Sequence, residues 1–426
     1  MIQQYRYEEI KIEDIFHRTE EKTDVADTVA AIIEDVRKNK DEALFRYCRQ
    51  FDGAELECLE VSEEERAAAL WQVDHEFLDI LREAAANIRA FHEKQKRQDF
   101  VVTEKDGVVL GQKIMPLDRA GVYVPGGTAS YPSTVLMDTI PAKIAGVKEI
   151  IMTTPAKGGK VNPVILAAAE IAGVDRIFKI GGAQAVAALA YGTESVPKVD
   201  KIVGPGNAFV AEAKKQVFGR VSIDMIAGPS EILILADDTC DAEIVAADML
   251  SQAEHDKMAS AVLVTDSQRL ADAVSAELER QIPLLPRAEI ARASIDECGK
   301  IILAESMVQA VEISNEIAPE HLEICVDHPF AYLAQIRHAG SIFLGKQAPE
   351  ALGDYFAGPN HTLPTSGTAR FSSPLSVDDF IKKSSFTYYT ADALREVGQK
   401  IVRFANEEGL QAHGRSVAVR LEKGGE

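Results

Sequence analysis

The sequence predicts an α/β fold with two lobes, each built on a parallel sheet, and helical segments at both ends of the chain. Two observations predict this fold. Short apolar runs of strand length alternate with segments of helical periodicity over about 260 residues, which is typical of parallel sheets with helices on both faces. Glycine-rich turns recur near the junctions between these segments. The alternating stretch is too long for one sheet, so we divide it into two lobes near residue 235.

The chain starts with a region in which we expect mostly helix. Residues 26–38 and 63–95 carry apolar side chains at helical spacing among many charges. Ser62, followed by Glu65, has the pattern of a capping box at the start of the second segment. Short strands are then expected at residues 101–103, 107–114 and 120–124.

Strands and helices alternate through the central part of the chain. We expect strands at 147–154, 176–180, 201–203, 231–236, 261–265, 301–304, 321–326 and 341–344. The helices predicted between them cover 161–172, 183–191, 208–218, 241–255, 268–281 and 306–317. From Asp378 the sequence returns to charged helix, which gains little stability alone and needs a packing partner, so it is a candidate dimerisation element. The predicted domains are an N-terminal helical region (1–118), a first lobe (119–235), a second lobe (236–377) and a C-terminal helical dimerisation tail (378–426).

The composition excludes several classes of function. The 426 residues include 67 acidic and 46 basic side chains, a formal net charge of −21. Such a balance argues against binding to nucleic acid or to an anionic membrane surface. No stretch approaches the ~20 apolar residues of a membrane span. The first residues, MIQQYRYEEI, contain no apolar signal core, and the five cysteines form no CxxC pair, so a reduced cytoplasm is expected.

Four glycine-rich turns are candidates for a ligand cleft. They cover residues 124–127, 180–184, 203–207 and 227–231 and carry the polar side chains Gln184, Asn207 and Ser230. In open α/β sheets, ligands bind near such turns because glycine lets backbone N–H groups approach them closely. The alternative is that these glycines only make tight turns. Gly204-Pro-Gly-Asn-Ala-Phe209 starts like a dinucleotide fingerprint but has Phe209 at the third glycine position, and no GxxxxGK[ST] motif occurs.

Several polar residues are candidates for chemistry. Gln252 and His255 lie three apart near a helix end and could share a metal ion, although by themselves they are more simply explained as a solvated helix end. Glu320 and His321 open an apolar strand and are residue types that act as general acid and base, unless they are a merely exposed pair. Further candidates are Asp354 and His361 in a loop rich in turn formers, and His413, which follows an ordinary C-cap glycine.

Together, these motifs resemble those of the histidinol dehydrogenase family. The resemblance runs from Gly121-Val-Tyr-Val-Pro-Gly-Gly127 to Glu408–His413 and is carried by GGAQA, VDKIVGPGN, AGPSE, SQAEHD, APEHLE, GDYFAGPNHTLPT and EGLQAH. It implies two Rossmann-like lobes and an NAD-dependent enzyme that oxidises L-histidinol through L-histidinal to L-histidine, the last two steps of histidine biosynthesis. It also implies a homodimer in which His413 completes the zinc site of the partner.

The resemblance assigns roles to individual residues. It implies that Glu320 and His321 are the catalytic acid–base pair, His321 taking the hydroxyl proton and Glu320 activating a water. The implied ligands of one Zn²⁺ per active site are Gln252, His255, Asp354 and His413. Substrate contacts are implied for these ligands and for Ser230, His321 and Glu408, and NAD contacts for Tyr123, Gln184 and Asn207. Whether zinc polarises the reacting oxygen or only positions the substrate stays open, as does replacement of zinc by Mn²⁺ or Co²⁺.

Two other functions compete with this interpretation. A thiol-dependent aldehyde dehydrogenase would need a nucleophilic cysteine in the cleft. Cys325 lies in an apolar strand and Cys240 in an acidic segment, and neither setting favours a thiolate. A metal-dependent binding protein without catalysis would not need the Glu320–His321 pair.

Overall fold

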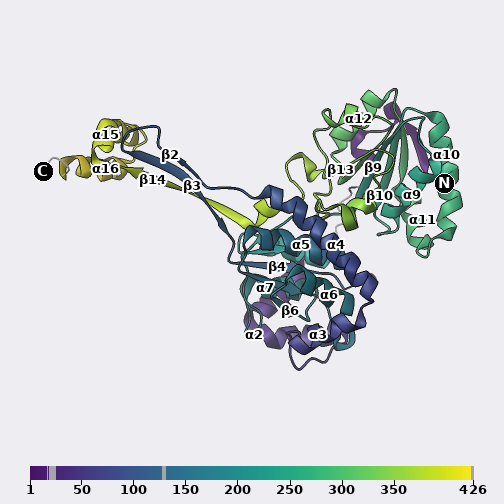
Figure 1. Ribbon diagram of the computed structural model, residues 1–426, viewed down its shortest axis with the longest axis horizontal. Helices are drawn as coiled ribbons and strands as arrows, with labels where there is room; N and C mark the ends of the chain where they lie inside the picture. The colour runs from purple at the N-terminus through teal and green to yellow at the C-terminus, as the bar shows by residue number, and fades with distance from the viewer. Residues whose placement is uncertain (17, 19–24, 127–130, 424–426) are drawn as a thin grey trace. The chain divides into compact units, whose positions relative to one another are not determined.

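The computed structural model describes residues 1–16, 18, 25–126 and 131–423. The chain forms two compact units (Figure 1). The first unit contains Met1–Gln95 and Leu117–Phe380, and the second contains Lys96–Pro116 and Ile381–Glu426. The predicted domain divisions at 118, 235 and 377 stay predictions. Among the described residues, no helix is long and apolar enough to cross a membrane.

The first lobe of the first unit is a doubly wound parallel sheet (Figure 1). Its strands lie in the order β6 (Arg176–Phe178), β5 (Glu149–Thr153), β4 (Arg119–Tyr123), β7 (Lys201–Val203) and β8 (Ser222–Ile223), and every neighbouring pair is parallel. One core contains buried side chains of α3 (Glu63–Gln72), α4 (His75–His92), α5 (Pro132–Ala145) and α6 (Pro163–Ala172). A second core contains side chains of α2 (Ala26–Asp52), α7 (Gly182–Tyr191) and α8 (Ala208–Val217). Helices on both faces explain why these short strands are mainly apolar after their first residues.

The second lobe of the first unit is a six-stranded parallel sheet. Its order is β1 (Gln3–Arg6), β11 (Lys300–Leu303), β10 (Ser260–Thr265), β9 (Glu231–Ala236), β12 (His321–Cys325) and β13 (Ser341–Leu344). The helices of this lobe include α9 (Ala242–Ala253), α10 (Gln268–Gln281), α11 (Ala288–Glu297) and α12 (Met307–Ile317). β9 and β12 are central and pair in register from Ile232 opposite His321 to Ala236 opposite Cys325. This register sets the starts of the two strands side by side.

The second unit combines a small antiparallel sheet with two helices. β3 (Val108–Pro116) pairs with β14 (Ile381–Tyr389) on one side and with β2 (Phe100–Val102) on the other. The chain then continues into α15 (Ala391–Glu407) and α16 (Gln411–Lys423), which pack on each other.

Most predicted elements are confirmed, including two parallel lobes and the capping box of Ser62 and Glu65. The predicted helix 63–95 is wrong as one element, because Val73 is extended and Asp74 caps a new helix by accepting from the Phe77 N–H at 3.2 Å. The N-terminal segment is not purely helical, since it supplies β1 to the second lobe. The C-terminal segment is likewise not purely helical, since β14 precedes its two long helices. Two further helices, α5 and α11, were not predicted from the sequence.

Candidate active site

The predicted acid–base pair lies at the start of β12 and is buried. After α12, Ala318 adopts a left-handed conformation (φ 53°), and the chain turns through Pro319 into Glu320 and His321. The side chains of Glu320 and His321 are only 8% and 5% exposed, so this is not an exposed dipeptide.

Both side chains bind the backbone of one residue on the neighbouring strand. The Glu231 N–H donates to Oε2 of Glu320 at 2.8 Å, and Nδ1 of His321 lies 3.0 Å from the Glu231 carbonyl oxygen. Because a carbonyl only accepts, Nδ1 carries the proton in this contact, which leaves Nε2 of His321 as the nitrogen able to take one. Nε2 is buried and has no hydrogen-bond partner among the described residues.

Two carboxylates lie near this nitrogen without touching it. Oδ1 of Asp354 is 3.7 Å and Oε1 of Glu350 is 3.8 Å from His321 Nε2. One ligand atom from each of these three residues lies within 4.8 Å of the other two, a spacing that can hold a metal ion. Glu350 was missed by the sequence analysis, because no motif marks it. The one available signal was its position directly after Pro349, at the start of a short helix, α14 (Glu350–Leu352).

Gln252 and His255 come from the end of α9. Gln252 is fully buried. With its nitrogen oriented toward Glu350, its side-chain amide donates to that carboxylate, and its oxygen accepts from the Glu231 N–H at 3.1 Å. His255 follows the helix, and burial lowers the pKa of its imidazole, while the charge of Asp354 acts in the opposite direction. Ser230, directly before β9, lies at the same edge of the sheet. The structure therefore brings Ser230, Gln252, His255 and Asp354 to the acid–base pair.

Asp354 lies on a loop that is anchored in the first lobe. It belongs to a short π-helical turn, Gly353–Ala357, which is a local geometry often found at functional sites. His361 contacts the Asp354 carbonyl oxygen through Nδ1 at 3.1 Å and Oγ1 of Thr134, on α5, through Nε2 at 3.3 Å. The neighbouring Thr362 donates to the buried carboxylate of Asp138 at 2.8 Å. These contacts hold the loop, so His361 here supports Asp354.

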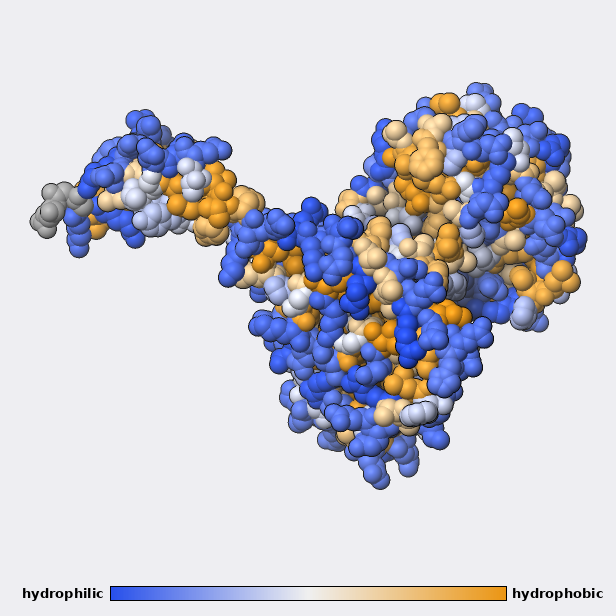
Figure 2. All heavy atoms as spheres, viewed as in Figure 1, coloured by the Kyte–Doolittle hydropathy of each residue, from blue (hydrophilic) through white to orange (hydrophobic). Residues whose placement is uncertain are grey.

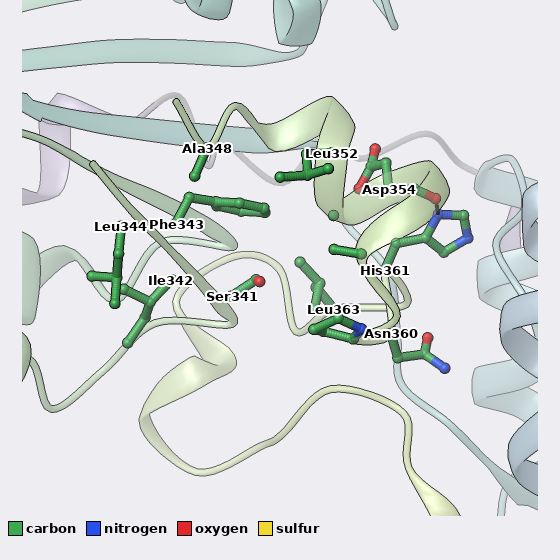
Figure 3. A pocket seen from close by; sticks show the side chains of 13 residues that line it. Ser341, Ile342, Phe343, Leu344, Ala348, Leu352, Asp354, Asn360, His361 and Leu363 are labelled. Atoms are coloured by element: carbon green, nitrogen blue, oxygen red, sulfur yellow. Dashed lines mark hydrogen bonds between the residues drawn. The ribbon is translucent and has the colours of Figure 1, made fainter. Parts of the chain in front are cut away.

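A cavity of about 260 Å³ adjoins this loop (Figure 3). Asp354 and His361 lie at one end, and Ile342 and Leu344 lie at the other. Its walls are mainly apolar, so a small ligand with a polar end and an apolar body would suit it.

The electrostatics of the cluster favour a cation. Burial raises the pKa of Glu320 to about 8 and that of Glu350 to about 7. Burial alone would lower the pKa of His321, but the charges of Glu350, Glu320 and Asp354 hold it well above its usual value. Buried acidic groups thus outnumber buried basic groups here, and a bound divalent ion would favour the ionised forms of these carboxylates. Imidazole, carboxylate and amide oxygen ligands suit zinc, so the residues present fit the predicted metal.

The comparisons with known proteins agree with this geometry. The sequence model of the family described as "Histidinol dehydrogenase" matches residues 16–421. The chain is 58% identical to the histidinol dehydrogenase of Bacillus thuringiensis subsp. konkukian over 92% of both chains. It is 55% identical to that of Clostridium acetobutylicum over 94% of this chain and 93% of the other. The chain belongs to the histidinol dehydrogenase family.

A solved structure supports the same assignment. The crystal structure of histidinol dehydrogenase from Elizabethkingia anophelis superposes with a TM-score of 0.95 at 39% sequence identity, over 100% of this chain and 99% of the other. The predicted fold class and the predicted oxidoreductase class are therefore confirmed.

The residues predicted to contact NAD lie at the carboxyl edge of the first sheet. Tyr123 ends β4, and its hydroxyl accepts from the Gly182 N–H at 3.1 Å. Gln184 is in the first turn of α7, and its buried Oε1 has no partner among the described residues. Asn207 caps α8 by accepting from the N–H groups of Phe209 and Val210. Gly127, in the first predicted turn, lies outside the described residues.

A buried ion pair holds the turn before Asn207. Lys214 pairs with Asp224, and their side chains are 3% and 1% exposed. Lys214 donates to the Gly204 carbonyl at 2.9 Å, and Asp224 accepts from the Gly204 N–H at 2.8 Å. Gly204 has φ +119°, and a Cβ there would lie 2.1 Å from the Tyr123 carbonyl oxygen, so only glycine fits.

The two lobes use opposite edges of their sheets. The candidate NAD residues follow the general rule for the carboxyl edge of a parallel sheet. The turn at 227–231, in contrast, precedes β9, and Glu231 and His321 are the first residues of β9 and β12. The candidate acid–base site of this family member therefore lies at the amino edge of the second sheet.

Two predicted site residues belong to the second unit. Glu408 is the C-cap of α15, followed by Gly409 in the left-handed region, and His413 is in the first turn of α16. Both are exposed. Their assignment to the zinc and substrate site stays a proposal.

The cysteines do not support a thiol mechanism. Cys325 ends the strand that His321 begins, about 13 Å away at 3.3 Å per residue. A hydrogen bond with Cys240 raises the pKa of its thiol, and burial raises it further. Cys240 is also buried and donates to the Cys325 carbonyl, at the edge of the sheet opposite His321.

Proposed function

We propose that the protein is a zinc-dependent, cytoplasmic histidinol dehydrogenase. It oxidises L-histidinol through L-histidinal to L-histidine with two NAD⁺, the last two steps of histidine biosynthesis. The observation that carries this proposal is the buried Nε2 of His321, which has no hydrogen-bond partner in the described part of the chain and lies 3.7 Å from Oδ1 of Asp354, while Nδ1 of the same ring lies 3.7 Å from Oε2 of Glu320. Buried titratable groups with perturbed pKa values cluster at catalytic sites, which favours an enzyme over a binding protein.

Four residues would hold the zinc ion, namely Gln252, His255 and Asp354 of the first unit and His413 of a partner chain. Bound there, zinc would supply positive charge that holds the substrate's imidazole and amine, or polarises the reacting oxygen. Ser230 and Glu408 would add polar contacts to the same substrate. Tyr123, Gln184 and Asn207 would hold NAD⁺, which accepts one hydride in each oxidation.

In the first oxidation, His321 acts as the base. Its Nδ1–H is held by the Glu231 carbonyl, so Nε2 is the nitrogen that acts as the base in the deprotonated imidazole. Nε2 takes the proton of the substrate hydroxyl as the carbon–hydrogen bond breaks. Glu320, Glu350 and Asp354 stabilise the imidazolium that results, because all three charges raise its pKa.

In the second oxidation, Glu320 acts as the base. The bound aldehyde must gain a hydroxyl group from water before it can lose another hydride. Glu320, with a pKa raised to about 8 by burial, is a stronger base than an exposed carboxylate and can take a proton from that water. The product of this addition is the gem-diol, and its oxidation gives L-histidine.

The second unit supports a homodimer with shared active sites. Its surface carries exposed apolar side chains, among them Phe386, Tyr388 and Phe404 at 40%, 58% and 68% exposure (Figure 2). The amphipathic helix α15 leaves Phe404 and Ile401 open to solvent, as a surface that meets a second copy would. A twofold dimer makes the exchange of His413 reciprocal.

Mixing two inactive variants tests the shared site. His321→Asn and His413→Asn proteins should regain activity when their subunits exchange, because one site of each mixed dimer then has both residues intact. If the subunits exchange and activity stays at the level of the separate variants, His413 acts within its own chain.

Metal analysis coupled to an assay tests the activity itself. Purified protein should contain one zinc per chain and form NADH when L-histidinol and NAD⁺ are added. Zinc-loaded protein that binds histidinol but forms no NADH would instead be a metal-dependent binding protein.

A further inference from the structure

We infer that Arg18 is a positioning residue for the acid–base pair, acting through Glu231. This inference rests on the proposed function of Glu320 and His321. Arg18 lies 213 positions before Glu231 in the chain, and no motif connects the two.

Glu231 is the residue on which both catalytic candidates depend for orientation. Its N–H binds the Glu320 carboxylate, and its carbonyl binds Nδ1 of His321. A shift of the Glu231 peptide groups would therefore turn both side chains at once. It would also weaken the hydrogen bond that keeps the proton of His321 on Nδ1 rather than on Nε2.

Arg18 fixes Glu231 with a two-pronged ion pair. Its Nε and Nη2 donate to Oε1 and Oε2 of Glu231 at 2.7 and 2.9 Å. The Glu231 side chain is 3% exposed, so its charge is desolvated and needs this partner. Parallel hydrogen bonds of this kind fix direction as well as distance.

The same guanidinium also holds the turn that carries the pair. Nη1 of Arg18 donates to the Ile317 carbonyl at 2.8 Å, at the end of α12. Ala318 follows in the left-handed region, and Glu320 comes two residues later. One side chain thus connects the start of β9 to the turn that leads into β12, the two segments between which the catalytic contacts form.

The surroundings of Arg18 are shaped for it. The Phe16 ring lies 5.1 Å below the guanidinium carbon, a cation–π distance. Gly367 packs against the guanidinium of Arg18, and a Cβ at that position would lie 2.8 Å from Nη1. An ordinary surface ion pair would need neither an aromatic ring under the arginine nor a glycine beside it.

The test compares Arg18→Met, Arg18→Lys and Glu231→Gln with a matched control. Arg176 binds Glu60 through the same two nitrogens and also donates to a carbonyl, but it lies on β6 of the first lobe. The two arginines are similarly exposed, whereas Glu60 is 36% exposed and Glu231 only 3%. Arg176→Met therefore removes a guanidinium–carboxylate fork of the same geometry, with a more exposed carboxylate, away from the catalytic contacts. For each protein we would measure kcat with histidinol and with histidinal, KM for NAD⁺, zinc content and melting temperature.

Arg18→Met should lower kcat on both substrates by about 10–100-fold, in line with the effect of a small misplacement of catalytic groups. The KM for NAD⁺ and the zinc content should stay near wild type. Arg18→Lys should recover part of the loss, since one ammonium cannot make the same fork. The control should keep kcat near wild type even where its melting temperature falls.

A second measurement does not depend on turnover. In protein with ¹⁵N-labelled histidine, the buried Nδ1–H of His321 should give a protected, downfield proton signal, identified by its absence in His321→Asn. The signal should be lost or broadened in Arg18→Met and retained in Arg176→Met. If wild type forms no NADH, the proposed function fails while this signal still decides the role of Arg18.

Unchanged kcat and an unchanged His321 signal in Arg18→Met would overturn the inference. If Arg18→Met does not fold, the same two readouts on Arg18→Lys and Glu231→Gln decide it, because both substitutions keep the volume of the site. Wild-type behaviour in those two variants would also overturn the inference.

Discussion

Replacing Glu320 by glutamine should separate the two oxidations. Glutamine has the same shape, and its side-chain oxygen can still accept from the Glu231 N–H, which Glu320 does at 2.8 Å. The fold and the first oxidation should therefore change little. The amide cannot take a proton from water, so the variant loses the base that the second oxidation needs.

The expected loss in histidinal oxidation follows from the role of Glu320 as a base and from its pKa. Loss of a general base costs about 10²–10⁴-fold, so histidinal oxidation should slow by that factor. In wild type, burial raises the pKa of Glu320 to about 8. At pH 7 about one tenth of this group is then ionised, and the rate should rise about tenfold as the pH passes well above 8. The rate must rise, and not fall, with pH because only the carboxylate form of Glu320 is a base.

The assay is a single turnover followed by NADH absorbance across a series of pH values. Reactions started from histidinal report the second oxidation, and the first NADH from histidinol reports the first. The rise with pH should be present for histidinal in wild type and absent in Glu320→Gln. Equal losses from both substrates, or the same pH rise in the variant, would refute this role for Glu320.

Three further predictions address the rest of the site. His321→Asn should slow the first oxidation more than the second, by about 10²–10⁴-fold; a larger loss when the reaction starts from histidinal would contradict the role of Nε2. Removing zinc with a chelator, or replacing His255 by alanine, should abolish turnover. The circular dichroism spectrum should stay intact, since the core of a chain this large does not depend on one ion. Full activity in protein shown to be metal-free would disprove the zinc assignment. Lys214→Met should leave the buried Asp224 without its ion-pair partner and lower the free energy of unfolding of the first lobe by about 3–5 kcal/mol, measured by urea denaturation. A transition at the wild-type urea concentration would show that the ion pair does not stabilise the lobe.

Local patterns were enough to predict most of the central elements. Strands such as β9 and β10 are short apolar runs between turn signals, and both are buried along their whole length. α5 was missed because its mixed Ser, Thr and Pro content hides a helix that is buried on nearly all sides. β14 was missed because its residues are exposed, so the sequence Lys-Lys-Ser-Ser shows no apolar alternation. Packing on several sides fixes α5, and pairing with β3 fixes β14, and neither contact can be read from a local pattern.

The site residues also differ in whether a local pattern marks them. Gln252, His255, Glu320 and His321 could be named as candidates because each lies in a short motif whose members are neighbours in the chain. Glu350 and Arg18 could not, since their roles depend on contacts made across long sequence separations. The amino-edge position of the acid–base pair was also beyond the sequence, because it depends on the register between β9 and β12.

The number of NADH molecules formed from a limiting amount of L-histidinol tests the central claim most directly. Zinc-loaded protein with excess NAD⁺ should form two NADH for each histidinol consumed, with L-histidine as the product and no histidinal released to solution. One NADH per histidinol, with the aldehyde as product, would contradict the proposed double oxidation at a single site.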